Sequence, residues 1–241
     1  MAEELRWAII GTGFISNTVA EAIAASPGSR VALVSGRNAG RVAEFAERHR
    51  IARTCVGFAD AVTDPDIDVV YVGTPNHTHH DVVTAAAAAG KAVLSEKSLT
   101  TTMATAHELV DAVRDKVFFV EGLMYLAHPV MQRFVDLLSE ERTGTVTAVH
   151  VRYAADIKSV VNPLGRGTIY NLGCYPVSLC TSSSSPPSVT TFSSDANLPV
   201  TARSRRMKRS ARRRHRSDSP TGSPRPSPRP TTTGWRLTLG Y

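Results

Sequence analysis

Two glycines near the start of the chain have the spacing that a phosphate-binding turn needs. The stretch "AIIGTGFIS" places Gly11 and Gly13 between an apolar run and a helix-like segment. Gly11 permits a tight turn, Gly13 lets the backbone approach a pyrophosphate, and the helix start supplies amide donors. The third position of the GxGxxG pattern is Ser16, a small departure. We therefore predict a dinucleotide site whose contacts come from Gly11, Thr12, Gly13, Phe14 and Ile15.

The segment "VSGRNAGR" indicates which dinucleotide fits. A carboxylate at the end of the second strand binds the ribose hydroxyls of NAD. Here Ser35, Arg37 and Asn38 offer donors and a positive charge instead, which suits a 2′-phosphate. NADP is therefore predicted over NAD, with NAD still possible. In the alternative interpretation Arg37 is a solvated residue at a helix start.

Lys97 follows the apolar run "KAVLSE" at the expected carboxyl end of a parallel strand, where such folds bind ligands. Hydride transfer between an alcohol and a nicotinamide also requires the hydroxyl proton to leave, so a donor/acceptor must lie beside the carbinol oxygen. Lys97 is predicted to be that group. The alternative is an exposed lysine that forms a salt bridge with Glu96.

The chain that carries these residues alternates short apolar runs with longer amphipathic segments. This alternation is typical of repeated βαβ units. The sequence predicts a Rossmann domain over residues 1–123, an α/β fold with a doubly wound parallel sheet. We expect strands at 6–10, 30–35, 68–73, 91–96 and 117–122, and helices at 14–26, 39–50, 79–90 and 103–115.

A different pattern begins after Gly122. A helix is predicted over 128–141, a long alternating strand over 145–156 and a helix over 167–179. Residues 124–180 therefore predict an incomplete α+β second domain.

Residues 181–241 have the composition of a disordered tail. They hold 8 of the 14 prolines and 12 of the 28 Lys/Arg, with a net charge of +10 against −3 for residues 1–180. Two hypotheses follow. The segment "RSRRMKRSARRRHR" would bind nucleic-acid phosphates by charge, although it has no aromatic residue for base stacking. Alternatively, a frameshift near codon 180 has produced the tail and truncated the second domain, which we favour.

The motifs "GTGFIS", "VVYVGTPNHTHHDVV" and "GKAVLSEKSL" together resemble the Gfo/Idh/MocA oxidoreductase family from about Arg6 to Cys180. The resemblance implies that Thr74, Pro75, Asn76 and His79 border the cofactor. It also implies that Glu96 and Lys97 form the charged part of the family's EKP motif. Ser98 replaces the proline, so the turn loses a fixed φ.

"GTIYNLGCYPVS" resembles the second-domain helix of the glucose-fructose oxidoreductase and dihydrodiol dehydrogenase branch, which carries a tyrosine acid/base. Tyr175 matches that tyrosine, and a neighbouring lysine would favour its phenolate. Asn171 stands where many relatives have an aspartate, and it can hydrogen-bond substrate but not take its proton. Lys97 and Tyr175 are the expected proton-transfer residues, with Glu96 orienting Lys97 or the nicotinamide ribose. The alternative for Tyr175 is a core tyrosine.

The predicted function is NADP-dependent oxidation or reduction of a secondary alcohol of a sugar, cyclitol or diol, impaired by the truncation. The alternatives are a catalytically silent NADP-binding module and a nucleic-acid-associated protein.

"HTHHD" is not expected to bind metal, because adjacent residues at a helix start point in different directions. Three cysteines without metal spacing, and no signal-like start, favour a cytoplasmic protein without a membrane partner. Homo-oligomers are expected of intact family members, but not of a truncated chain.

Overall fold

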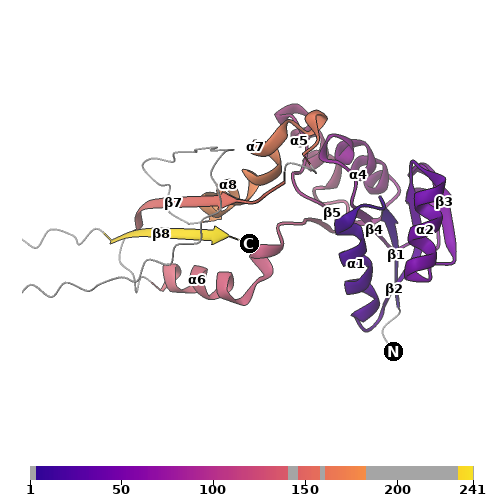
Figure 1. The fold of residues 1–241 in the computed structure, drawn as a ribbon, viewed down its shortest axis with the longest axis horizontal. Coiled ribbons are helices and arrows are strands. Elements are labelled where there is room, and N and C mark those ends of the chain that lie inside the picture. Colours follow the sequence, from indigo (N-terminus) through magenta and orange to yellow (C-terminus); the bar gives the residue numbers. More distant parts are fainter. Residues whose placement is uncertain (1–3, 141–145, 158–160, 183–232, 241) are drawn as a thin grey trace, which may run out of the picture.

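A computed structural model describes residues 4–140, 146–157, 161–182 and 233–240. Its main body is a six-stranded sheet in the order β3-β2-β1-β4-β5-β6, in which all neighbours are parallel (Figure 1). This is the doubly wound topology that the sequence predicts. The strands are β1 Leu5–Ile10, β2 Ser29–Gly36, β3 Arg53–Val56, β4 Val69–Val72, β5 Ala92–Ser95 and β6 Phe119–Glu121.

Helices connect these strands and cover both faces of the sheet. They are α1 Phe14–Ala25, α2 Ala39–His49, α3 Ala59–Thr63, α4 His79–Ala88 and α5 Met103–Val113, with a 3₁₀ turn η1 at Asn76–Thr78. The strand β3 and the helix α3 are short and were not among the elements predicted. They form from "RTCV" and "ADAVT", which are too short to show a clear hydrophobic period.

Each face of the sheet has its own hydrophobic core. Ile9 of β1 and Tyr71 of β4 pack with α1 and α2, whereas Ala8 and Val70 of the same strands pack with α3, α4 and α5. Successive side chains of a strand point to opposite faces, so a sheet buried on both faces needs continuously apolar strands. The runs "WAII" and "VVYV" meet this requirement.

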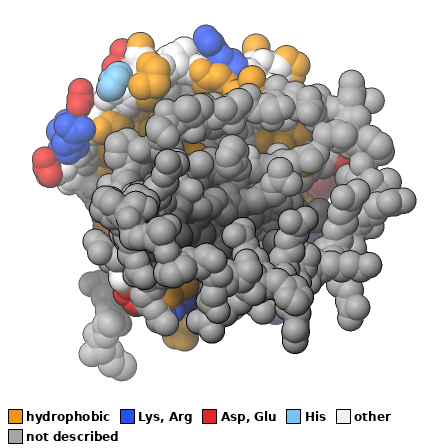
Figure 2. All heavy atoms as spheres, turned by 90° about the vertical axis from the view of Figure 1, so that its left-hand side faces the viewer, with side chains coloured by type: hydrophobic (Ala, Val, Ile, Leu, Met, Phe, Trp, Pro, Cys, Tyr) orange, Lys and Arg blue, Asp and Glu red, His pale blue; other side chains and the backbone are white. Residues whose placement is uncertain are grey.

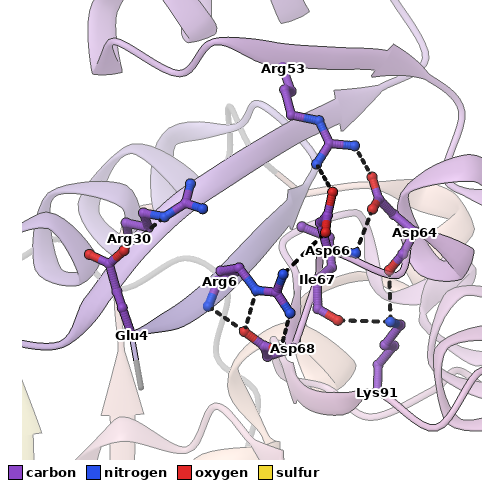
Figure 3. Close-up of polar contacts among 9 residues, drawn as sticks. All are labelled: Glu4, Arg6, Arg30, Arg53, Asp64, Asp66, Ile67, Asp68 and Lys91. Atoms are coloured by element: carbon purple, nitrogen blue, oxygen red, sulfur yellow. Dashed lines mark hydrogen bonds and ion pairs between the residues drawn. The ribbon is translucent and has the colours of Figure 1, made fainter. Parts of the chain in front are cut away.

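The amino ends of the strands are joined by a charged network (Figure 3). Arg6 of β1 donates from Nη2 to Asp68 Oδ1 at 2.8 Å and from Nε to Asp68 Oδ2 at 3.0 Å. Lys91, just before β5, donates from Nζ to the carbonyl oxygens of Asp64 and Ile67, each at 2.7 Å. The network connects the amino ends of the strands, whereas the glycine turn lies at their carboxyl ends.

The chain then leaves the sheet for a second part. It contains the turn η2 at Met124–Ala127, α6 at Pro129–Ser139, β7 at Val146–Ala154, the turn η3 at Pro163–Gly165, α7 at Gly167–Leu172 and α8 at Cys174–Ser182.

One helix was expected over 167–179, but the structure has two, α7 and α8, with Gly173 between them. Pro176 lies in the first turn of α8 and has no backbone N–H to donate to Leu172. A helix start tolerates a proline far better than a helix interior does. Gly173 and Pro176 therefore explain why the helix divides.

Within the predicted tail the structure describes one regular element, the strand β8 at Thr233–Gly240. This strand pairs with β7 in parallel register, for example Val151 with Leu237 (Figure 1). Apolar residues alternate with polar ones in "WRLTLG", which is a strand pattern that the average composition of the tail conceals. The other tail residues after Ser182 lie outside the described residues, as does the basic segment of the nucleic-acid hypothesis.

Figure 2 views the chain from the side of β7 and shows hydrophobic side chains among charged ones along the upper edge. Exposed apolar side chains of the second part include Leu164, Ile169 and Val177. No helix in the part of the chain that the structure describes has the length and apolar character to cross a membrane.

Candidate active site

The glycine turn has the geometry that a dinucleotide requires. Gly11 has a φ of +107°, and a Cβ there would lie 2.7 Å from the carbonyl oxygen of Gly73. Both observations restrict this position to glycine. A Cβ at Gly13 would meet nothing within 4 Å, and Gly13 is the N-cap of α1. The space above Gly13 is therefore open to a ligand, next to free amides at the helix start. Phe14, with 85% of its surface exposed, borders this space.

Ser16 occupies the third position of the glycine pattern and is completely buried. It faces Gly73 at the end of β4, where a Cβ would overlap the Ser16 hydroxyl oxygen. The third glycine of the pattern normally permits close packing of helix and strand. In this chain Gly73 provides that space from the strand side, so Ser16 does not push α1 away from the sheet.

Of the three residues predicted to select NADP, two are exposed and one is buried. Arg37 and Asn38 are exposed at the start of α2, and the Asn38 side chain caps that helix by accepting a hydrogen bond from Arg41 N at 3.0 Å. Ser35 is fully buried. Its side chain points to a covered face of the sheet, whereas those of Arg37 and Asn38 face solvent, so Ser35 is the least accessible of the three predicted cofactor contacts.

The turn from Thr74 to Thr78 lies at the carboxyl end of β4. Thr74 Oγ1 accepts from Thr78 Oγ1 at 2.9 Å, Pro75 is exposed, and Asn76 Nδ2 donates to the carbonyl oxygen of Gly165 at 3.1 Å. Asn76 thus connects this turn to η3 of the second part. Its side chain has a structural partner in addition to any contact with a cofactor.

His79 is fully buried beneath this turn. Its Nε2 lies 2.8 Å from the Thr74 carbonyl oxygen and its Nδ1 lies 3.0 Å from the Ser98 carbonyl oxygen. Burial lowers the pKa of His79, although the neighbouring carbonyls oppose that effect. His79 thus links the Thr74 turn to the loop after β5, and its place beside the cofactor stays a prediction. The other histidines of "HTHHD" have separate partners, Asn162 for His77 and Asp81 and Glu108 for His80.

Glu96 and Lys97 stand at the carboxyl end of β5, as predicted. Glu96 Oε1 accepts a hydrogen bond from the Tyr71 hydroxyl at 3.1 Å. Burial raises the pKa of the Glu96 carboxyl, against the opposing effects of the Tyr71 hydroxyl and the Lys97 ammonium. Burial, with the charge of Glu96, also raises the pKa of Tyr71. The hydroxyl of Tyr71 on the neighbouring strand β4 therefore holds the Glu96 carboxyl in place.

Lys97 meets α7 and α8 of the second part. Its Nζ donates to Asn171 Oδ1 at 2.6 Å and to the Asn171 carbonyl oxygen at 2.9 Å. The same atom lies 5.5 Å from the centroid of the Tyr175 ring. Only 7% of Tyr175 is exposed, and its ring also packs against Tyr125 and Tyr153. The structure thus brings the predicted Lys97, Asn171 and Tyr175 together from distant parts of the chain.

The side-chain oxygen of Asn171 accepts a hydrogen bond from Lys97. Its amide nitrogen and the second lone pair of that oxygen can still contact another group, so the bond from Asn171 to substrate stays a prediction. Sequence reasoning also missed the Ser98 hydroxyl, which donates to the Tyr170 carbonyl oxygen. The departure from the EKP motif at Ser98 was the signal that could have found it.

Comparison with known proteins agrees with this geometry. Residues 5–121 match the model of the oxidoreductase family with an NAD-binding Rossmann fold, Gfo/Idh/MocA. The chain is 33% identical over 183 residues to a trans-1,2-dihydrobenzene-1,2-diol dehydrogenase of Xenopus laevis, covering 73% of this chain and 56% of the relative. An uncharacterized oxidoreductase of Rhizobium meliloti is 33% identical, covering 72% and 54%. The chain therefore spans about half the length of the curated relatives it matches.

Two solved structures are also similar. The 3-ketoreductase KijD10 from Actinomadura kijaniata, in complex with NADP and TDP-benzene, has a TM-score of 0.65 and 26% identity, covering 75% of this chain and 57% of its own. A levoglucosan dehydrogenase, in complex with NADH and levoglucosan, has a TM-score of 0.59 and 27% identity, covering 62% and 44%. With the glycine turn, the Thr74 turn and the Glu96–Lys97 pair in place, residues 5–121 form a nucleotide-binding part of the Gfo/Idh/MocA oxidoreductase type.

Proposed function

We propose that this chain binds NADP at the β1–α1 turn and that its reaction is hydride transfer between the nicotinamide and a secondary alcohol or ketone of a sugar, cyclitol or diol. The observation that carries the proposal is the position of Lys97 Nζ. It lies at the carboxyl edge of the sheet, between Asn171 and the Tyr175 ring. The glycine turn opens on the same edge.

The site has the features that the cofactor requires. Gly13 leaves open space at the start of α1, where amides would donate to the pyrophosphate. The exposed guanidinium of Arg37 would bind the 2′-phosphate, and none of the ion pairs among the described residues involves it. NADP, when bound, supplies or accepts the hydride.

Lys97 and Tyr175 are proposed to move the proton of the substrate hydroxyl. An ammonium has three N–H groups, and two of those of Lys97 point to oxygens of Asn171. The third can donate to a substrate oxygen. During oxidation the Tyr175 phenolate, which the neighbouring ammonium favours, would accept the hydroxyl proton as the hydride leaves carbon, and in reduction the phenol would return it while Lys97 donates to the same substrate oxygen. Glu96 is proposed to fix the strand end beneath Lys97 rather than to exchange protons.

The relatives support the substrate class only in broad terms. Their names give a dihydrobenzenediol, levoglucosan and a 3-ketoreductase, so the chemistry that they share is at hydroxyl or keto carbons. Because the names agree only in that chemistry, we propose no narrower substrate class. The silent binding module remains the second candidate, because Tyr175 is only 7% exposed and packs against Tyr125 and Tyr153.

A binding experiment tests the proposal. Gly13 has an ordinary extended φ of −78°, and a side chain there has free space, so Gly13→Val should fold normally. It would, however, fill the space of the pyrophosphate. The full chain should gain thermal stability with NADP and less with NAD, and Gly13→Val should gain none. An NADP response that is equal in both proteins, or absent from both, would contradict the proposed function.

A further inference from the structure

Two consecutive residues of the loop after β5 bind two consecutive residues of α7. Lys97 donates from Nζ to the oxygens of Asn171, and Ser98 donates from Oγ to the carbonyl oxygen of Tyr170. The last carbonyls of a helix have no partner within it, and Tyr170 and Asn171 lie at the carboxyl end of α7. Those carbonyls are therefore available to donors from outside the helix, and the loop supplies them.

Ser98 is also tied to the sheet side of the site. It is only 9% exposed, and its own carbonyl oxygen lies 3.0 Å from His79 Nδ1. The other ring nitrogen of His79 lies 2.8 Å from the carbonyl oxygen of Thr74. Ser98 therefore has α7 on its side-chain face and, through His79, the Thr74 turn on its backbone face.

Resting on the proposed function, we infer that Ser98 is a positioning residue: its hydroxyl holds the end of α7, and through Asn171 it fixes the ammonium of Lys97. Tyr170 and Asn171 share one peptide unit, so the bond from Ser98 to the Tyr170 carbonyl oxygen also sets the position of Asn171, which in turn binds Lys97. A proline at position 98, as in the family motif, has no hydroxyl and could not make this bond. The hydrogen bond from this hydroxyl is therefore a feature of this chain, and the family motif with proline cannot make it.

The inference is testable without any turnover, by the reactivity of Lys97. Lys91 serves as an internal reference, because its Nζ is also held by two backbone oxygens, those of Asp64 and Ile67, at the far edge of the sheet. The full chain is labelled briefly with acetic anhydride in the absence of dinucleotide. Mass spectrometry then gives the labelling rate of each lysine.

Ser98→Ala should raise the labelling rate of Lys97 about three- to tenfold, the range expected from loss of one neutral hydrogen bond. The rate of Lys91 should not change. Ser98→Thr keeps a hydroxyl and should stay within about twofold of the parent chain, whereas Ser98→Cys keeps the volume with only a weak donor and should resemble Ser98→Ala. Ser26→Ala, an exposed serine at the end of α1, is the matched control.

An unchanged Lys97 rate in Ser98→Ala and Ser98→Cys would overturn the inference. An equal rise at Lys91 would overturn it too, because it would show general loosening of the fold. If the parent chain does not bind NADP, the proposed function fails while the labelling result still stands. Where turnover is measurable, Ser98→Ala should lower kcat more than it raises the KM for NADP, which a merely structural role would not produce.

Discussion

The ammonium of Lys97 lies within hydrogen-bond distance of two oxygens of a single residue, at 2.6 Å from Asn171 Oδ1 and 2.9 Å from the Asn171 carbonyl oxygen. Both acceptors are neutral, because residue 171 is an asparagine. Lys97 is therefore oriented without a carboxylate partner on α7. This relationship makes the charge at position 171 the first target for mutation.

Asn171→Asp should lower the labelling rate of Lys97 at a fixed pH by about threefold or more, because a hydrogen bond from the ammonium to a carboxylate is charge-assisted and stronger than one to an amide oxygen. The measurement is the acetylation rate of Lys97, with Lys91 in the same sample as the reference. An identical Lys97 rate in both proteins would show that residue 171 does not act on the ammonium.

Tyr175→Phe should reduce any turnover by about 100-fold or more, the usual contribution of a general acid/base, with NADP affinity unchanged. Tyr125→Phe is the matched control, because Tyr125 packs on the same ring and donates to Ser178 Oγ at 2.7 Å. That control should lose about 1 kcal/mol of stability but keep its turnover. Single-turnover kinetics at saturating NADP separates the two. Equal losses in both variants would assign Tyr175 to the core.

Arg37→Asp should reverse the cofactor preference. Replacing a guanidinium by a carboxylate removes a charge-assisted bond to the 2′-phosphate and adds repulsion, so the Kd for NADP should rise about tenfold or more. NAD binding should be unchanged or improve, because a carboxylate at this position can accept from ribose hydroxyls. Titration of both dinucleotides checks this, with Arg50→Ala at the opposite end of α2 as control. A parallel loss of NAD affinity would indicate a structural role for Arg37.

Gly73→Ala should destabilise the nucleotide-binding part by about 1–3 kcal/mol, the usual range for overpacking. The added Cβ would overlap the Ser16 hydroxyl and lie 2.7 Å from Tyr71 Cε1. Urea unfolding gives the free energy of unfolding for each variant. Adding Ser16→Gly should restore part of the loss but not all, because the contact with Tyr71 remains. Full stability in the single variant would show that α1 is not packed as described.

Asp68→Asn should lower the free energy of unfolding near neutral pH by about 1 kcal/mol, a modest value because the Arg6 pair is partly exposed. Hydrogen bonds from Arg6 lower the pKa of Asp68 from its ordinary 3.8 to about 2. A carboxyl whose pKa is lower in the folded state stabilises the fold above about pH 4 and loses that contribution as the pH falls toward 2. The two proteins should therefore converge at acid pH. Asp66→Asn, with a more exposed side chain, should show a smaller difference at pH 7.

Strong local patterns made the nucleotide-binding sheet predictable. The apolar runs of β1, β2 and β4 favour buried parallel strands, and Gly11 and Gly13 indicate the ligand edge. The side-chain contacts were harder to predict from the sequence. Strand alternation buries Ser35, and only the three-dimensional structure shows that both ring nitrogens of His79 are already occupied by backbone oxygens.

The second part was harder to predict because its contacts depend on residues far apart in sequence. Nothing local in "NLGCYP" indicates that Asn171 meets Lys97, 74 positions earlier. The division of the helix at Gly173 was visible as a Gly and a Pro within four residues. The strand β8 was hidden by the polar, basic residues that precede it.

The distance in sequence between the loop after β5 and the end of α7 also sets an order of events on the ribosome. The sheet from β1 to β6 is complete before Tyr170 and Asn171 are synthesised, and domains tend to fold as they emerge. A nascent chain would thus form the glycine turn at the carboxyl edge of the sheet first, and the bonds between the loop after β5 and α7 only later. Until α7 has left the ribosome, the Lys97 ammonium has neither oxygen of Asn171 to hold it.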